Sequence, residues 1–524
     1  MRKLIVLLWM LASLAGARDA QSESRACPML LPTPGERYVV AISDLHFGLG
    51  RQGGAWNPTE DFRWSSALKG FLDRTSACGR QTVDLVIAGD AMELWQPPPE
   101  VKCAGANADT ACTPSELLLL VKMVIKAHGS DFEALGSFAD EGSNRVFFVP
   151  GNHDAGILLD SLWSEVQAAA SSKTGRVLRC GGAAPRPCAP NGLWLSENGL
   201  VAIEHGHQIG SDVNAFSKWP EVLVDVEGQK YLERPWGEYF VQKLFNKEEA
   251  EYSIIDNLSP ETAGARYRMA DRGLWESIYD VARFLRFNVF ETSLSQKLQT
   301  FGTPGGPSDV DVSQARARGY KLVSSALLPD DPLLKELNGN SPEALALRTE
   351  LTRMIKNESS VEELSLLCSQ IAIRSGGADT CGATFGAVFQ QLLVPKQRVF
   401  AKHLNSRMKE PGAGGLRLFV YAHTHTLEEG WWVKTDKRPV QVFNTGAFQR
   451  VVSEPGFLRR AKAKGLAPAA ALSKLTVESL APCYTAVVVA MDPDTQLPNG
   501  RTVRWRMEEG GAGAFVAATD ASCE

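Results

Sequence analysis

The sequence lacks three features that would point to particular classes of protein. Lysine and arginine number 55 against 60 acidic residues, so the net charge is −5 and no basic surplus predicts a nucleic-acid partner. The ten cysteines include no Cys-x-x-Cys pair, which argues against a structural zinc site. Beyond the amino terminus, no apolar run reaches the ~18 residues of a membrane span. These absences leave a globular chain whose 524 residues can form several domains, or one domain with insertions.

The amino terminus carries the one apolar run. Arg2 and Lys3 precede the apolar stretch 4–14, and residues 15–17 are small. This pattern predicts a secretory signal peptide over residues 1–17, cleaved after Ala17, and therefore a secreted or periplasmic protein. A buried core helix and an uncleaved membrane anchor are the alternatives.

The ten cysteines fit an oxidising compartment, where close pairs form disulfides. One sequence does not determine the pairing. Three pairs lie close enough along the chain to staple loops: Cys103 with Cys112, Cys180 with Cys188, and Cys368 with Cys381.

The chain alternates short apolar strands with polar or helical stretches over residues 36–210, which predicts the first part of a layered α/β domain. Strands are expected at 38–43, 83–88, 145–149 and 200–204. Residues 211–411 show helical periodicity without strands, and we interpret them as a helical insertion, or cap, within one catalytic domain. A separate domain joined by linkers is the alternative. Strand patterns at 416–421, 440–443 and 484–491 place the second part of the domain in residues 412–524.

Six of the eight histidines lie in short polar segments that directly follow predicted strands. One such segment alone is usually a hydrogen-bonded loop. Five in one chain, at the ends of strands where α/β sheets place their sites, indicate a functional centre. The segments are Ser43-Asp-Leu-His46, Gly89-Asp90, Gly151-Asn-His-Asp154, Glu204-His-Gly-His207 and Ala422-His-Thr-His425.

The side chains of these segments are carboxylates, imidazoles and one amide, without a thiolate. This set suits two divalent ions such as Mn, Fe, Zn, Co or Ni. One aspartate can bridge two ions about 3.5–4 Å apart, the spacing that two-metal hydrolases use. Asp90 is the candidate bridge because it is the only candidate ligand in its segment.

These five segments, in this order, resemble the calcineurin-like metallophosphoesterases. The resemblance covers residues 38–210 and 416–448 and leaves the helical insertion unexplained. It implies a four-layer α/β sandwich with the site at the loops. It also implies that Asp44, His46 and His425 hold the first metal, that Asp90 bridges, and that Asn152, His205 and His423 hold the second. The nucleophile would be a metal-bound hydroxide, since coordination lowers the pKa of water toward ~7.

Two further residues take catalytic roles from the resemblance. His153 would donate a proton to the leaving oxygen or stabilise the phosphate in the transition state, and Glu93 would orient His153. For Glu93 the alternative is a surface helix glutamate. His207 either touches the site without being a ligand or is structural. Ala422 replaces the glycine that is usual before His-x-His, and the metal-bound tyrosine of the purple acid phosphatases is replaced by Glu93.

The segment Gly89-Asp-Ala-Met-Glu-Leu-Trp95 also looks like the corresponding part of the UDP-2,3-diacylglucosamine pyrophosphohydrolases. Those enzymes have arginine in place of His153, work in the cytoplasm and have a far shorter lid, so the likeness is local and assigns no substrate. The insertion carries aromatic residues that either pack its helices together or accept an acyl chain or a nucleobase. They are Trp219, Trp236, Phe240, Phe245, Trp275, Phe284 and Phe287.

The sequence therefore predicts an exported two-metal hydrolase of a phosphomonoester, phosphodiester or pyrophosphate bond. Its substrate would be a phosphorylated small molecule, a nucleotide or a lipid-linked phosphate. The alternative is a non-catalytic metal-binding or scaffolding protein whose insertion binds a partner. Such proteins usually lose ligands, and every ligand position is filled here. A nuclease is disfavoured by the acidic balance and the export signal, although scavenging of extracellular nucleic acid would escape both objections.

Overall fold

The structure, a computed structural model, describes residues 27, 36–182, 187–210, 214–259, 263–264, 267–268, 396–508 and 512–524. The predicted signal peptide, the pair Cys368 and Cys381, and the aromatic residues Trp275, Phe284 and Phe287 lie outside these ranges. In the described part of the chain, no helix combines the length and the apolar character that crossing a membrane requires.

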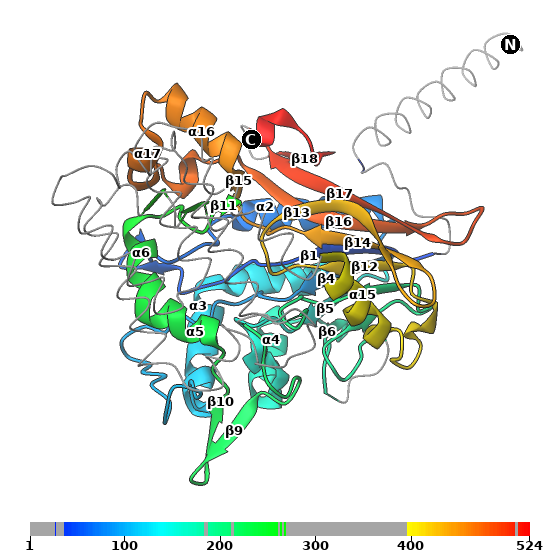
Figure 1. Cartoon of the computed structure of the whole chain (residues 1–524), viewed down its shortest axis with the longest axis horizontal. Helices are drawn as coiled ribbons and strands as arrows, with labels where there is room; N and C mark the ends of the chain where they lie inside the picture. The colour runs from blue at the N-terminus through cyan, green and yellow to red at the C-terminus, as the bar shows by residue number, and fades with distance from the viewer. Residues whose placement is uncertain are drawn as a thin grey trace, which may run out of the picture.

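The larger of two main sheets has seven strands in the order β18-β17-β16-β1-β4-β5-β6 (Figure 1). Strands β1, β4, β5 and β6 are parallel, and β16 joins antiparallel to β1. Every residue of β1 and β4 is buried, as expected for strands that are covered on both faces. In sheet order, the bounds are Gly513–Ala517, Pro498–Met507, Cys483–Met491, Tyr38–Ile42, Val83–Ala88, Arg145–Val149 and Val177–Arg179. The four strands expected in this sheet are thus confirmed.

The smaller sheet has five strands in the order β13-β14-β12-β8-β7. Strands β14, β12 and β8 are parallel to one another. In sheet order, the bounds are Leu427–Lys434, Pro439–Thr445, Leu418–Tyr421, Val201–Ile203 and Trp194–Leu195. The strands expected at 200–204, 416–421 and 440–443 correspond to β8, β12 and β14, with slightly different ends.

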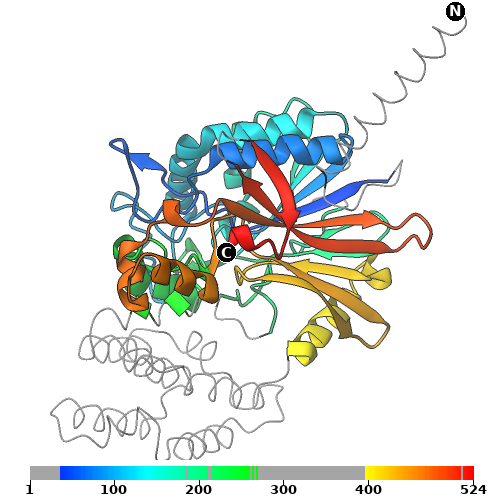
Figure 2. The same ribbon diagram turned by 90° about the horizontal axis from the view of Figure 1, so that it is seen from above.

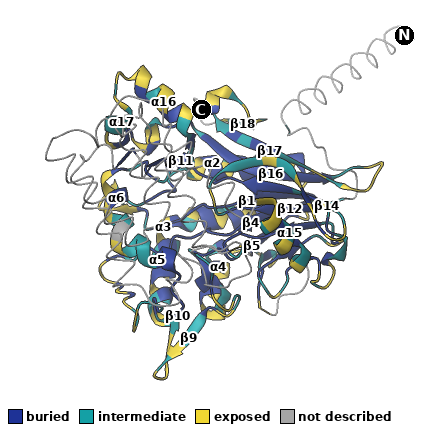
Figure 3. Ribbon diagram, in the orientation of Figure 1, coloured by how far each residue is buried: buried dark blue, intermediate teal, exposed yellow. Residues whose placement is uncertain are grey.

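The two sheets pack face to face around an apolar core that includes Val39 of β1, Val86 of β4, Ile203 of β8 and Val420 of β12. Helices α2 (Ser65–Cys78), α3 (Pro114–Asp140) and α4 (Asp160–Ala170) cover the outer face of the larger sheet. Helix α15 (Lys396–Arg407) covers the smaller one. Figure 2 shows the blue and cyan helices on one side of the sheets and yellow α15 on the other. The expected four-layer sandwich is confirmed, and in Figure 3 its central strands are dark blue because they are buried.

The chain after residue 210 begins with a hairpin of strands β9 (Leu223–Val226) and β10 (Gln229–Leu232). The expectation that this region lacks strands is therefore wrong here. Glu227 and Gly228 form the two-residue turn, both with positive φ (54° and 83°), the conformation that tight hairpins favour. In the sequence, the only signal for this turn is the pair Glu227-Gly228, and this signal is weaker than the helical periodicity around it.

The following segments lie against the carboxy-terminal part of the chain. They are helix α5 (Trp236–Phe240), a π-helical turn η2 (Val241–Phe245), helix α6 (Asn246–Glu251) and strand β11 (Leu258–Ser259). Strand β11 pairs with β15 (Val452–Ser453), and the residues around it share a core with helices α16 (Glu454–Ala463) and α17 (Pro468–Lys474). These short helices fall within the expected insertion at 211–411, most of which lies outside the described residues.

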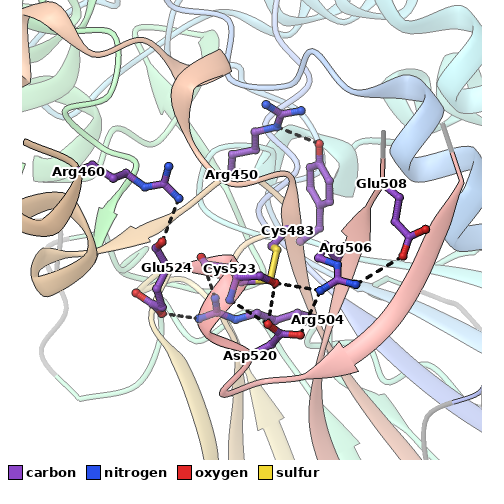
Figure 4. The surroundings of a disulfide bond; sticks show 11 residues. Arg450, Arg460, Cys483, Arg504, Arg506, Glu508, Asp520, Cys523 and Glu524 are labelled. Carbon is purple, nitrogen blue, oxygen red and sulfur yellow. Dashed lines mark hydrogen bonds and ion pairs between the residues drawn. A yellow bond between two sulfur atoms is a disulfide. The ribbon is translucent and has the colours of Figure 1, made fainter. Parts of the chain in front are cut away.

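Four disulfides are present in the described residues. The predicted pairs Cys103–Cys112 and Cys180–Cys188 are confirmed, and Cys27–Cys78 and Cys483–Cys523 are additional. Figure 4 shows that Cys523 ties the last turn of the chain to β16, where Arg504 binds the Glu524 carboxylate at 2.9 Å. These disulfides are compatible with an extracellular or periplasmic protein.

Candidate metal centre

The five polar segments meet at the carboxyl ends of β1, β4, β5, β8 and β12. The loops after β1 and β4 are joined by backbone hydrogen bonds, from the Asp44 amide to the Gly89 carbonyl (3.1 Å) and from the His46 amide to the Asp90 carbonyl (3.0 Å). The His205 imidazole crosses between the sheets, since its Nδ1 lies 2.9 Å from the Ala88 carbonyl oxygen at the end of β4. Side chains far apart in sequence are thereby held around one point between the sheet ends.

Asp44, His46 and His425 form one group at this point that could hold an ion, with one ligand atom of each within 4.8 Å of the others. The Nε2 of His425 lies 3.3 Å from Oδ1 of Asp44. The Nε2 of His46 lies 4.0 Å from Oδ1 of Asp44 and 4.0 Å from Oδ2 of Asp90. A gap of 4.0 Å is too long for a hydrogen bond, but it matches the roughly 3–4 Å between two ligands of one ion.

Asp90, His205 and His423 form the second group. The Nε2 of His205 lies 3.0 Å from Oδ2 of Asp90 and 2.8 Å from Oδ1 of Asn152, so the Asn152 amide oxygen points into this group. Because Oδ2 of Asp90 lies near both His46 and His205, its carboxylate stands between the two groups, where a bridging ligand would be. The structure thus brings together all seven residues that the sequence proposed as ligands.

The donor atoms fit divalent cations because the protein leaves several of them unsatisfied. Oδ2 of Asp44 and Nε2 of His46 are buried and have no hydrogen-bond partner in the described part of the chain. A buried polar atom without a partner is unfavourable, so this arrangement is stable only when something else binds these atoms. A divalent cation satisfies carboxylate oxygens and imidazole nitrogens together.

The backbone at these residues is in a conformation that residues other than glycine rarely adopt. Positive φ angles occur at Asp44 (51°), His46 (48°), Asp90 (51°), His423 (75°) and His425 (49°). Each such residue costs of order 1–3 kcal/mol, and strain of this kind concentrates at functional sites. The strained turns direct neighbouring side chains, such as those of His423 and His425, to different metal positions.

Two glycines in the segments are required because ligand side chains occupy the space beside them. A Cβ on Gly89 would lie 2.3 Å from Nδ1 of His205, and one on Gly151 would lie 2.0 Å from Oδ1 of Asp90. Ala422, which replaces a usual glycine, is not among the residues with positive φ, so alanine is accommodated there.

His153 lies beside the metal groups and is held by Glu93, Asp90 and Trp95. Its Nδ1 lies 2.6 Å from Oε2 of Glu93, its backbone amide donates to Oδ1 of Asp90 (2.9 Å), and its ring stacks on Trp95 with centroids 3.9 Å apart. The same Glu93 oxygen lies 2.9 Å from Nδ1 of His46. Glu93 is buried rather than on a helix surface, so the alternative considered for it is wrong. With Nδ1 of His153 held by Glu93, Nε2 remains for a ligand.

The buried charges of the centre stabilise one another. Burial would raise the pKa of Asp90, but His205 and His153 lower it well below its usual range. Burial would lower the pKa of His153, but Glu93 and Asp90 raise it to about 9. Burial likewise opposes ionisation of Glu93, but His153 and His46 lower its pKa to about 2. An ionised Glu93 next to a protonated His153 is the arrangement that a proton donor requires.

Other residues of the motifs support the site from behind. Asp154 is buried and accepts hydrogen bonds from the amides of Gly151 (2.7 Å) and Ala91 (2.8 Å), which fastens its own turn to the loop after β4. His207 is buried next to the centre, and its ring meets that of Trp219 edge-on at 4.4 Å. His207 therefore packs beside the site.

Sequence reasoning did not identify two neighbours of the site. Trp95, which carries the ring stacked on His153, belongs to the quoted segment that starts at Gly89, so its place two residues after Glu93 was the available signal. Asn214, whose Nδ2 lies 3.3 Å from Nε2 of His423, comes from the segment after residue 210 and had no signal in the sequence.

The remaining histidines, His128 and His403, lie on helices outside the metal groups. His128 of α3 is buried between Glu60 and Asp131, and His403 of α15 pairs with Glu204. These ion pairs are consistent with a structural role for both histidines.

A two-sheet sandwich with paired carboxylate and imidazole groups at the strand ends defines a metal-dependent phosphoesterase fold. Residues 38–289 match the family of calcineurin-like phosphoesterases, which supports the metallophosphoesterase superfamily. The match indicates a metal-dependent phosphoesterase that acts on phosphorylated substrates. The matched range contains the ligand candidates from Asp44 to His205, whereas His423 and His425 follow it. Comparisons with curated proteins and with solved structures found no match.

Proposed function

We propose that the protein is an exported hydrolase that uses two divalent ions to cleave a phosphomonoester, phosphodiester or pyrophosphate bond. The observation that carries the proposal is the position of the Asp90 carboxylate between the two histidine-containing groups. The same carboxylate accepts a hydrogen bond from the backbone amide of His153. One ion would be held by Asp44, His46 and His425. The other ion would be held by Asn152, His205 and His423, and Asp90 would bind both ions. Ions bound there would polarise the phosphoryl group and activate water as the nucleophile.

The protein itself would supply proton transfer and orientation. Glu93 holds Nδ1 of His153 and Trp95 holds the ring plane, and Nε2 would face the leaving oxygen of a bound substrate. A protonated His153 in this position donates its proton as the bond to phosphorus breaks. These contacts favour an enzyme over a scaffolding protein, because a scaffold has no need for a fixed imidazole beside its metals.

The test is hydrolysis of an aryl phosphomonoester, an aryl diester, nucleotides and a nucleotide-sugar by purified protein supplied with Mn, Zn or Ni. We expect Asp90→Asn and His153→Ala to lower kcat on the best substrate by at least about 100-fold. The matched control is Asp160→Asn, because the Asp160 side chain is 93% exposed and belongs to neither metal group. Unchanged turnover by both site variants would refute the catalytic assignment.

Export is the second part of the proposal, and the predicted signal peptide and the disulfides support it. We expect the mature chain to begin at Arg18 and to be found outside the cytoplasm. Cell fractionation with amino-terminal sequencing tests this. A full-length chain in the cytoplasmic fraction would contradict it.

A further inference from the structure

A second group of carboxylates lies beside the metal centre. Asp61, in the loop before α2, Glu249 of α6 and Asp256, in the turn after α6, each place one oxygen within 4.8 Å of the other two. We refer to these three residues as the acidic cluster. Asp61 is 8% exposed and Glu249 is 2% exposed, so two of the three carboxylates are buried.

The protein leaves acceptor oxygens of this cluster unsatisfied. The neighbouring Glu60 accepts hydrogen bonds from the amides of Gly48 (3.3 Å), Gly50 (2.5 Å) and Phe62 (3.2 Å). Asp61, by contrast, has neither a hydrogen bond nor an ion pair within the described ranges, and only partial compensation comes from His46, which acts to lower the pKa of Asp61.

Glu249 is only half satisfied. Its Oε2 accepts from Nε2 of Gln96 (2.7 Å), while its buried Oε1 has no hydrogen-bond partner among the residues that the structure describes. A buried carboxylate that lacks a partner on the protein points to a ligand.

The electrostatics of the cluster also call for a cation. Burial and the nearby Asp256 raise the pKa of both Asp61 and Glu249 well above the usual range. Buried carboxylates this close together repel one another unless they are protonated or a cation lies between them. The protein provides no arginine or lysine for Asp61 or Glu249 in the part of the chain described.

The ligand set differs from that of the metal centre. It contains carboxylate oxygens from three separate segments and no imidazole. Oxygen-only sites of this kind prefer hard cations, Ca²⁺ above all when the ligands come from flexible loops, over the transition metals that histidine favours.

We propose that the acidic cluster is a third cation site, which binds one Ca²⁺ ion and fastens α6 and the turn after it to the loop before α2. The site would also steady the wall next to His153, because Gln96 binds Glu249 and directly follows Trp95, whose ring stacks on His153. The proposal does not depend on the proposed hydrolysis, since it concerns binding and stability.

The test uses full-length protein whose metal centre is kept saturated with Mn²⁺ while Ca²⁺ is added. We expect elemental analysis after gel filtration to find about one Ca²⁺ per chain, and the melting temperature to rise with Ca²⁺ concentration, as for any ligand that binds only the folded state. Asp61→Asn and Glu249→Gln preserve side-chain size and should each weaken Ca²⁺ binding at least tenfold. Glu251→Gln is the matched control, because it removes one exposed charge from the same helix.

The variants also report on their own folding. With Mn²⁺ present and no Ca²⁺ added, Asp61→Asn and Glu249→Gln should melt at or above the temperature of the unmodified protein, because each removes repulsion within the cluster. The proposal would be overturned if the melting temperature of both variants still rose with Ca²⁺ as in the unmodified protein. It would also be overturned if the unmodified protein bound no Ca²⁺. Neither result depends on whether any phosphate ester is hydrolysed.

Discussion

Among single residues, Glu93 connects the metal ligands to the proton donor. One of its oxygens contacts both His46 and His153, and the other accepts from the Trp95 amide at 2.6 Å. A single buried carboxylate therefore orients a ligand and a catalytic imidazole together. Glu93 therefore belongs to the site although it is not one of the seven ligand candidates.

We predict that Glu93→Gln lowers kcat about 10–100-fold at saturating metal, because an amide cannot hold both imidazoles as a carboxylate does. KM should change little, since Glu93 is buried and does not reach the substrate. Steady-state kinetics at increasing Mn²⁺ separate this effect from weaker metal binding. Glu100→Gln, an exposed charge change in the same loop, serves as the control, and equal kcat values for the two variants would contradict the role of Glu93.

Gly151 provides a second test at this scale. A Cβ there would lie 2.0 Å from Oδ1 and 2.5 Å from the backbone nitrogen of Asp90, so Gly151→Ala must displace the bridging candidate. We expect bound metal to fall below two ions per chain and kcat to drop about 100-fold, as for other displacements near 1 Å. Elemental analysis and steady-state kinetics measure both.

The control for Gly151→Ala is Gly129→Ala in α3, where an added Cβ meets nothing within 4 Å. Here activity should be unchanged and the free energy of unfolding should rise by about 0.5–1 kcal/mol, because alanine favours the helix. Full metal occupancy in Gly151→Ala would show that the loop can shift without losing the centre.

At the scale of elements, helix α3 supports the loop after β1 through its kink. The helix departs from helical geometry at His128 (φ −115°, ψ 24°), where the imidazole lies 3.2 Å from Oε1 of Glu60 and 3.1 Å from Oδ2 of Asp131. Glu60 in turn binds the amides of Gly48 and Gly50. The kink thus connects the helix to the loop that carries Asp44 and His46.

This connection should depend on pH. Burial lowers the pKa of His128, but Asp131 and Glu60 outweigh it and raise the pKa to about 9. Because the folded pKa exceeds the unfolded value of about 6.5, protonated His128 stabilises the fold fully below pH ~6.5, and this contribution is lost as pH rises through ~9. Its size is about 3 kcal/mol at most.

We therefore expect His128→Gln to lower the free energy of unfolding by about 2–3 kcal/mol at pH 6 and by much less at pH 10. Urea unfolding of both proteins at each pH measures the difference. A penalty that is the same at both pH values would mean that packing against Phe47, whose ring stacks on His128 at 4.9 Å, matters more than the charge.

For the whole molecule, the sequence predicted what depends on local pattern. Buried strands and the polar residues directly after them are local signals, so the strands of the sandwich and the seven ligand candidates could be read from the chain. Asp44, His205 and His423 come together because parallel strands of two sheets end at the same place. Their assignment to particular metal positions came only from the resemblance to a family.

Features that depend on long-range packing were missed. The acidic cluster joins Asp61 to residues almost 200 positions later, and no periodicity marks such a contact. The stacking of Trp95 on His153 and the pair Cys483–Cys523 are of the same kind. The hairpin at 223–232 was missed for another reason, because a short alternating pattern was set against a longer helical one.

The two disulfides Cys103–Cys112 and Cys483–Cys523 offer a test of how the whole chain is stabilised. They close loops with sequence separations of 9 and 40 residues. Constraining the unfolded chain is worth more for the longer loop, about 4 kcal/mol against about 3 kcal/mol in the chain-entropy model. The Cys483–Cys523 bond also holds the last turn, in which the Cys523 carbonyl accepts from Arg504 (3.1 Å) and the Glu524 carbonyl accepts from Arg460 (3.0 Å) (Figure 4).

We expect replacement of Cys483 and Cys523 by serine to destabilise the protein by about 4 kcal/mol, and the same change at Cys103 and Cys112 to cost about 3 kcal/mol. Urea unfolding of the two double variants, each beside the unmodified protein, measures both losses. The reverse order would mean that contacts in the folded state, rather than the entropy of the unfolded chain, decide what each disulfide contributes. In that case the hydrogen bonds that Arg504 and Arg460 donate around Cys523 would be sufficient to hold the final turn against β16.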